Sequence, residues 1–510
     1  MDTNLSTLAY QRESTWGTAP ASPALKKARI TGENLMHEKD TAESAEIRDD
    51  RQKPDSALVG SGAGGQVKFE LSWLMFQHWL EAALMGVLTV LNISITVSVS
   101  ASTQIITGTA GDFTNVIVGG TVKIAGFATS ANNGLKRVVA KATDGSTITL
   151  AAGSITTNES SESITIVGTL VRNGSTAYSY FMERKVPKTP SGYAYQRFLG
   201  MMVDKLSLDF KSKAIVTGNL SFVGSLGQVN DVSLMDATGV YASGTLTLTG
   251  LPLADEVTVI GSKTYVWKAS VSTTANQVKI GASASASLDN LIAAINGEAG
   301  GGTTYGSLTV AHTQVVAAAG AGDTMTLTAV DIGAGGNSIA TTETLTNGSF
   351  GAVTLTLGDT PDTYTAADGG EILNATSNVG TITRDAAAMS EKFKSFSIDI
   401  VNNLRGRDAI GELGNFSVGV GSFGLSGKME CYFRDNAMLA DVIAHENTSL
   451  SYRVTDPDGN IMVVDIPRLV FSVGNASIDK LDSDVMVPLE WKAVRDPVTD
   501  ATCVFSFIAA

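Results

Sequence analysis

Residues 71–100 form the most hydrophobic stretch of the chain, and the spacing of its hydrophobic positions changes partway along. The hydrophobic residues that share one broad arc of a helical wheel are Trp73, Phe76, Trp79, Leu80, Ala83 and Leu84. Because Gln77, His78 and Glu81 fall on the opposite side, residues 71–86 are predicted to form an amphipathic helix. The second half alternates apolar with polar residues, which predicts a strand. A membrane span needs about 20 uninterrupted apolar residues, so this stretch is predicted to join a helix to strands.

Two long regions, 88–170 and 237–359, consist mainly of short alternating runs separated by turn residues, which is typical of strands. They contain 19 charged residues in 206 positions, whereas the other 304 positions contain 67. This contrast indicates two modules inserted into a more highly charged host. The second module also holds one predicted helix, with Ser287 as its N-cap and an end at Asn296-Gly297. The residues expected to form its buried stripe are Leu288, Leu291, Ile292 and Ile295.

The last part of the chain predicts a strand, a helix, a hairpin and further strands. Asp435 or Asn436 is expected to cap the helix. The residues expected to face inward from it are Met438, Leu439, Val442 and Ile443. The sequence "DPDG" at 456–459 predicts the turn of the hairpin.

Residues 1–60 are polar, rich in both charge signs and without a clear period, so they cannot bury enough apolar surface alone. Two interpretations remain open. The segment is either a disordered leader or an arm that becomes ordered only against a neighbouring subunit. Trp16 and the pair Pro20 and Pro23 favour the arm, because linkers rarely contain tryptophan.

Composition excludes several classes of function. The 510 residues carry a formal net charge of −14, which disfavours tight binding of nucleic acid. Cys431 and Cys503 cannot form a disulfide framework, and the N-terminus has no signal-peptide pattern, so no export is expected. Two G-x-G-x-x-G matches, at 60–65 and 419–424, run into strands and not into a helix, so no dinucleotide cofactor is expected. Since histidine spacing suits no metal and no nucleophile motif occurs, we expect no metal site, cofactor or catalytic residue.

The host segments resemble the tail tube, or major tail, proteins of tailed bacteriophages. The resemblance starts in "AYQRESTWGTAPASPALKKARITGENL", "SAEIRDDRQ" and "ELSWLMFQHWLEAALMG", and continues in "NGSTAYSYFMERKV", "GMMVDKLSLDF" and "FVGSLG". It ends in "GSFGLSGKMECYFRDNAMLADVIAHENTSLSYRVTDPDGNIMVVDIPRLVF" and "DVMVPLEWKAVRDP", so it covers about 300 residues. The inserted regions resemble small β modules that recur in phage tail proteins.

The resemblance implies a mainly β fold, a tail-tube β-sandwich or barrel with a flanking α-helix and two inserted small β-rich domains. The expected organisation, in chain order, is a first core part at 1–87 that includes the arm at 1–60, a first module at 88–170, a second core part at 171–236, a second module at 237–359 and a third core part at 360–510. The residues expected to take part in self-assembly are Tyr10, Trp16, Pro20, Pro23, Arg48, Asp49, Asp50 and Arg51. The residues expected to pack the flanking helices are Trp73, Phe76, Leu80, Leu439, Val442 and Ile443.

The resemblance further implies a structural virion protein, assembled in the bacterial host cytoplasm, that is not an enzyme. Its main partner is itself, in six-fold rings that stack into a hollow tube, with tape-measure, tail-tip and terminator proteins as further partners. DNA passes through such a tube without specific binding, and an acidic or neutral lumen suits that role because basic walls would hold phosphates. The modules are expected outside the tube, where they contact host-surface glycans. The alternative is a β-rich adhesion protein that binds carbohydrate through exposed aromatic side chains; an enzyme has no supporting motif.

Overall fold

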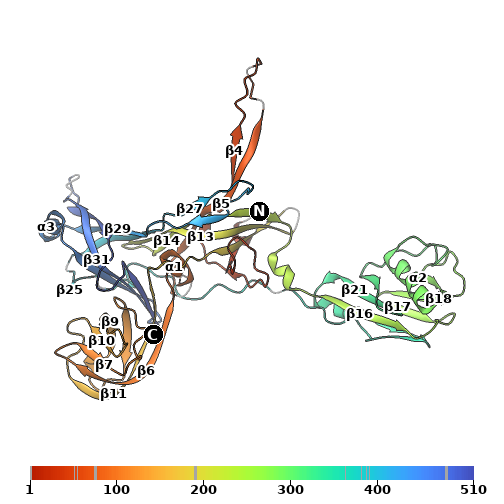
Figure 1. Ribbon diagram of the computed structural model, residues 1–510, viewed down its shortest axis with the longest axis horizontal. Coiled ribbons are helices and arrows are strands. Elements are labelled where there is room, and N and C mark those ends of the chain that lie inside the picture. Colours follow the sequence, from red (N-terminus) through yellow and green to blue (C-terminus); the bar gives the residue numbers. More distant parts are fainter. Residues whose placement is uncertain are drawn as a thin grey trace. The chain divides into compact units, whose positions relative to one another are not determined.

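The computed structural model describes residues 3–50, 52–53, 55–73, 77–188, 192–361, 363–380, 382–385, 387–389, 391–476 and 481–510. The chain forms two compact units (Figure 1). Unit 1 contains residues 1–20, 26–231 and 366–510, and unit 2 contains residues 21–25 and 232–365. Residues 88–170 lie in unit 1, and residues 237–359 lie inside unit 2. The prediction of a mainly β fold is confirmed.

The core of unit 1 consists of two groups of paired strands that share one long strand, β13 (Tyr193–Lys211). The strands on the first side are β1 (Thr7–Arg12), β2 (Lys26–Lys27), β12 (Tyr180–Pro187) and β15 (Leu226–Asn230). The strands on the second side are β3 (Gly32–Glu33), β4 (Met36–Glu43), β5 (Ser56–Glu70), β14 (Thr217–Gly224), β26 (Phe393–Val401), β29 (Gly424–Tyr432), β30 (Thr448–Thr455), β31 (Ile461–Gly474), β32 (Met486–Ala493) and β33 (Val504–Ile508). Short pairs form at β24 (Thr383–Arg384) with β25 (Ala387–Ala388), and at β27 (Arg405–Arg407) with β28 (Ser417–Gly419).

Strand β13 changes partners at an irregularity near Gly200. Before this point β13 pairs with β12 and β15, and after it with β14 and β26. The register between β12 and β13 shifts between Tyr180 and Met182, which is the mark of a bulge. Gly200 has a φ of +69°, a conformation that favours glycine. The bulge therefore bends β13 from one sheet into the other.

Helix α1 (Gln77–Leu84) lies against β13 and is shorter than predicted. Leu80 is buried, as expected for a core-packing residue, and Phe76 lies outside the described residues. Glu81, predicted on the polar side, is buried: its carboxylate lies 3.7 Å from the Arg12 guanidinium and accepts the Leu88 N–H at 3.2 Å. The helical-wheel prediction is wrong for Glu81 because a charged side chain that has such partners can be buried in the folded protein. No helix in the described part of the chain is long and apolar enough to cross a membrane.

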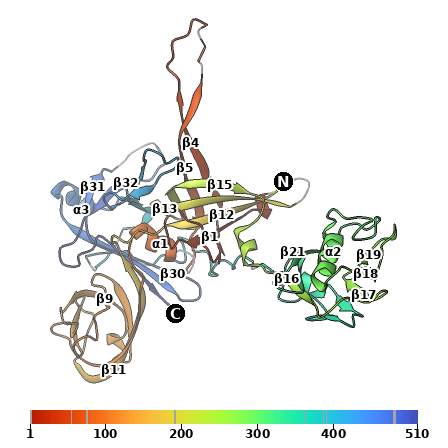
Figure 2. The same cartoon turned by 45° about the vertical axis from the view of Figure 1, so that its right-hand side comes forward.

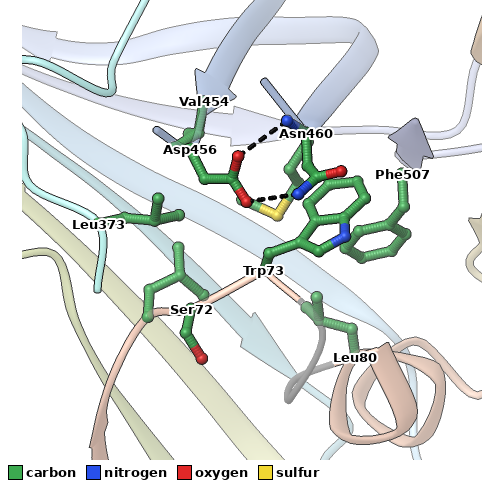
Figure 3. A pocket seen from close by; sticks show the side chains of 10 residues that line it. Ser72, Trp73, Leu80, Leu373, Val454, Asp456, Asn460 and Phe507 are labelled. Carbon is green, nitrogen blue, oxygen red and sulfur yellow. Dashed lines mark hydrogen bonds between the residues drawn. The ribbon is translucent and has the colours of Figure 1, made fainter. Parts of the chain in front are cut away.

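Trp73 precedes α1 and packs against the end of the chain. Its ring lies edge-on to Phe507 at 5.6 Å between centroids, next to the turn held by Asp456 and Asn460 (Figure 3). The cavity beside it, of about 10 Å³, has room for no more than about one water molecule. It is a packing gap and not a ligand site. The same turn confirms the predicted hairpin, with Gly459 at a φ of +89°.

Residues 89–172 form a closed barrel of six strands within unit 1. In chain order these are β6 (Thr89–Ser100), β7 (Ile105–Thr107), β8 (Thr121–Ala125), β9 (Gly134–Lys141), β10 (Thr147–Leu150) and β11 (Glu159–Arg172). The ladder runs β6–β7–β10–β9–β8–β11 and returns to β6, so no barrel edge stays open. The alternating pattern of this region put hydrophobic side chains inside, where they form one core.

The barrel is joined to the core by a ladder and by a buried carboxylate. Strand β33 pairs with β11 on one edge and with β31 on the other. Asp465 of β31 is fully buried, accepts the Thr121 hydroxyl of the barrel at 2.9 Å, and lies 3.8 Å from the Arg137 guanidinium. Burial raises the pKa of the Asp465 carboxyl above its ordinary value. Val504 of β33 is part of the barrel's own hydrophobic core.

Helix α3 (Ala437–Ala444) lies on β31 and begins at the expected cap, Asn436, although the Asn436 side chain makes no capping bond. Leu439 and Val442 pack against the core as predicted. Ile443 is 85% exposed, so its prediction as an inward residue is wrong. The helix is apolar on nearly every side and spans only two turns, so the wheel could not distinguish the face that packs.

Unit 2 is a sandwich of two four-stranded sheets with one helix, α2 (Ala284–Asn296). The strands of one sheet are β16 (Tyr241–Leu248), β20 (Val315–Ala319), β21 (Thr324–Ile332) and β23 (Gly348–Phe350). The strands of the other are β17 (Val257–Ile260), β18 (Lys263–Lys268), β19 (Gln277–Lys279) and β22 (Thr341–Glu343). The predicted stripe and end of α2 are confirmed, but the N-cap is Ser283, which accepts the Ala286 N–H; Ser287 is buried one turn later.

His312 of unit 2 is buried as a neutral imidazole. Its Nδ1 accepts the Gln314 N–H at 3.1 Å, so the proton lies on Nε2, which donates to the Ile260 carbonyl at 2.9 Å. Burial first, and then the positive charge of Lys263, lower the pKa of His312 below its ordinary value. If the ring were protonated, Nδ1 would also carry a hydrogen, and this N–H would face the Gln314 N–H, so that two donors would meet.

We predict that removing 88–170 destabilises unit 1, whereas removing 237–359 does not, each gap being closed by a short Gly-Ser join. The first deletion leaves β33 without its partner strand β11, and it leaves Asp465 without Thr121 and Arg137. We expect these losses to lower the free energy of unfolding of unit 1 by about 3 kcal/mol or more. Thermal unfolding of the two variants measures the difference. Equal melting of both would contradict the structural role of the barrel.

We predict that unit 2 loses stability as the pH falls below about 6.5. The unfolded chain binds a proton at the ordinary histidine pKa of about 6.5, whereas folding lowers the pKa of His312. The contribution of His312 to the stability of unit 2 is therefore complete above this pH, and it is lost as the pH falls below it. His312→Gln keeps an acceptor and a donor but does not titrate. Denaturant titrations of the unit 2 transition at several pH values should show a flatter profile for this variant, and an unchanged slope would exclude His312 as the cause.

Candidate self-assembly surfaces

The first strand of the chain is part of its own subunit's core. Strand β1 pairs with β12 over its whole length. Tyr10 is 5% exposed and packs against Trp79, with 4.5 Å between ring centroids, and against Tyr180. Burial raises the pKa of Tyr10 to about 12. The interpretation of this strand as a disordered leader or as an arm ordered only by a neighbour is therefore wrong, because the ladder and Tyr10 order it within one chain.

The segment after β1 closes the bulge of β13. The Glu13 carboxylate accepts the Gly200 N–H at 2.8 Å, and the Trp16 indole N–H donates to the Gly200 carbonyl at 3.2 Å. A bulge removes backbone groups from the ladder, and buried backbone groups need other partners. Trp16, expected to contact a neighbouring subunit, thus binds its own chain. A Cβ at Gly200 would meet the Trp16 ring at 2.9 Å.

The two prolines lie in different units. Pro20 is the last residue of the first segment of unit 1, and Pro23 is buried in unit 2. Beside Pro23, the Leu25 N–H lies 3.5 Å from the Met235 sulfur, and the Leu25 carbonyl accepts the Thr365 N–H at 2.9 Å. Residues 21–25 therefore belong to unit 2. The prolines are placed by contacts in their own chain, and their part in assembly stays a prediction.

Strands β4 and β5 form a hairpin that extends well beyond the sheet, as both views show (Figures 1 and 2). Its tip contains Arg48, Asp49 and Asp50, all exposed, and Arg48 pairs with Asp50 at 2.8 Å. Arg51 lies outside the described residues. Ile47 at the tip is 98% exposed. A two-stranded hairpin is marginal alone in water, so this one is a surface that a partner would stabilise.

An apolar surface lies where the hairpin leaves the sheet. We define the hairpin-base patch as the exposed side chains of Leu58, Val59, Ile410, Leu413 and Phe416. The loop between β27 and β28 lies beside β5, because the Ser61 N–H donates to the Leu413 carbonyl at 2.7 Å and Ser61 forms a parallel bridge with Gly414. Exposed apolar side chains on two adjacent segments are typical of protein interfaces.

Sequence reasoning missed the hairpin-base patch. Its residues are about 350 positions apart, so no local pattern connects them. Gly60, Gly62 and Gly65, the glycines of the first G-x-G-x-x-G match, lie inside β5. The described residues contain no group of three or more side chains that could hold a metal ion.

We predict that Tyr10→Ala lowers the free energy of unfolding of unit 1 by about 3 to 5 kcal/mol, because it empties a buried aromatic site. Leu5→Ala is the matched control, since Leu5 is exposed just before β1 and should change little. Urea denaturation of the unassembled protein gives both values. Similar small effects of the two changes would mean that the first strand is not part of the subunit core.

Comparison with known families gives one result that covers nearly the whole chain. The model of the family "Phage tail tube protein" matches residues 3–358 and 330–493. A search of curated proteins finds no match. The match includes β1, the β4–β5 hairpin, the barrel, unit 2 and the strands of the core as far as β32, but not β33. The chain belongs to the phage tail tube protein family, and it is a structural component of the tail tube and of the virion.

Proposed function

We propose that this protein forms six-fold rings that stack into the hollow tube through which phage DNA is delivered to the host cell. Family membership supplies the tail tube role. The observation that carries the finer proposal is the unsupported β4–β5 hairpin with its hairpin-base patch. When one face of a subunit contacts a different face of the next subunit, the contacts can close a ring or build an open stack.

The hairpin supports contacts between copies for two reasons. The outer edge of β4 has no partner strand among the described residues, so its backbone groups are free for a neighbour. The hairpin-base patch is apolar and exposed in a single chain. Covering it in an assembly removes apolar area from water, at about 25 cal/mol per Å². Arg48, Asp49 and Asp50 then set which surface of the neighbour the tip meets, because complementary charges select partners.

The charge of the protein suits a conduit that does not hold DNA. The chain carries −14, so a ring of six copies carries a large negative charge. Each basic side chain paired with a phosphate would release counterions and slow the DNA. An acidic or neutral lumen would leave the DNA free to move. Tape-measure, tail-tip and terminator proteins would bind the ends of the stack, and the subunits would assemble in the host cytoplasm. No catalytic step is part of the proposal.

The alternative, an adhesion protein that stacks sugars on aromatic rings, has less support in unit 2. Three of the aromatic residues in unit 2 are Tyr265, Trp267 and Tyr305. All three are buried in unit 2, where Trp267 donates its indole N–H to Thr258 at 3.0 Å. Buried rings build the core and present no face to a sugar.

We predict that Val59→Asp abolishes tube formation without unfolding the subunit, because it places a charge within the hairpin-base patch where a neighbour would exclude water. Val316→Asp, at an exposed strand position of unit 2, is the matched control and should assemble normally. Negative-stain images and sedimentation velocity report assembly, and thermal melting reports folding. Wild-type protein that stays monomeric under all conditions, alone and with other tail components, would overturn the proposal.

A further inference from the structure

A cleft of about 660 Å³ lies where the barrel meets the core of unit 1. Its walls are the segment 85–89 after α1, the loop 114–118 before β8, the end of β9, the loop 172–176 after β11, and the turn 498–500 before β33. All of these segments belong to unit 1 of a single chain. The volume lies in the range of clefts that bind small molecules. Unlike the gap beside Trp73, this cleft can hold a ligand of one or two sugar rings.

The cleft has an excess of positive charge. The Lys141 ammonium group donates to the carbonyls of Thr114 at 2.6 Å and Val116 at 2.9 Å, which fixes its position at the wall. Burial first, and then the charge of Arg172, lower the pKa of Lys141. The Arg172 side chain is exposed and makes no hydrogen bond or ion pair with the described part of the chain. Asp500 also lines the cleft, but Arg495 already neutralises it, with Nε 2.6 Å from the carboxylate.

The remaining walls offer hydrogen-bonding and aliphatic groups. Asn115 and Ser175 are exposed, and their side chains have no hydrogen-bond partner among the described residues. Val87 and Val498 expose aliphatic surface to the same space. Cations bind a carboxylate by charge-assisted hydrogen bonds, amide and hydroxyl groups bind sugar hydroxyls, and valines cover the apolar side of a pyranose ring.

We propose that this cleft binds an acidic saccharide of the uronic-acid class. An anion near Lys141 and Arg172 relieves the repulsion between the two cations. A phosphate ion alone fills only a small part of the volume and leaves Val87 and Val498 uncovered. The cleft is complete within one subunit, so the inference does not depend on ring formation.

The test is calorimetric titration of the full-length protein at low salt with digalacturonate. Saturable binding is expected, with lactose as the neutral disaccharide and glycerol phosphate as the phosphate probe both binding at least about tenfold more weakly, or about 1.4 kcal/mol. Arg172→Gln removes the free cation, and Asn115→Asp adds a negative charge to the wall. Each should weaken digalacturonate binding by about tenfold or more.

Lys123→Gln is the matched control, because it removes one positive charge from the barrel outside the cleft. It should leave the affinity unchanged, and thermal melting of every variant confirms folding. The proposal is overturned by absent binding of digalacturonate, by equal binding of lactose or glycerol phosphate, or by an equal loss in Lys123→Gln. If Arg172→Gln impairs tube assembly while the wild-type protein binds no saccharide, the cleft receives an acidic side chain of another subunit instead.

Discussion

The bulge of β13 at Gly200 is the interaction on which the core of unit 1 depends. One strand serves two sheets only if it bends, and the bend takes the N–H and the carbonyl of Gly200 out of the ladder. Glu13 and Trp16 satisfy both groups from the N-terminal segment. Burial raises the pKa of Glu13 despite its hydrogen bonds. The start of the chain is thus ordered by a requirement for hydrogen-bond partners in the middle of the chain.

The need of backbone groups for hydrogen-bond partners also distinguishes strand edges that are paired within the chain from those that are left unpaired. The barrel closes on itself, β33 has partners on both edges, and the two sheets of unit 2 cover one core. The β4–β5 hairpin is different, because it has a free edge, a charged tip and an apolar base. In a protein whose family forms the tail tube, these unsatisfied surfaces are where contacts between copies are most useful.

The two β-rich regions that share a low charge are attached in different ways. Unit 2 has its own core, and it includes residues 21–25 from near the start of the chain. The barrel shares β33 and the buried Asp465 with the core of unit 1. The barrel is therefore built into unit 1, and its junction with the core creates the cleft that contains Lys141 and Arg172. A common composition does not imply a common mode of attachment.

The sequence by itself determined the elements whose pattern is local. It predicted the mainly β class, the stripe and end of α2, the turn at Asp456, and the family. It failed where a distant contact decides: Glu81 is buried because Arg12 and the Leu88 N–H meet it, and Ile443 is exposed because α3 packs through another side. Tyr10 is in the core because β12 pairs with β1, and the hairpin-base patch joins residues about 350 positions apart. Periodicity reports which side chains avoid water within one element, whereas the tertiary structure alone decides which partners lie across the fold.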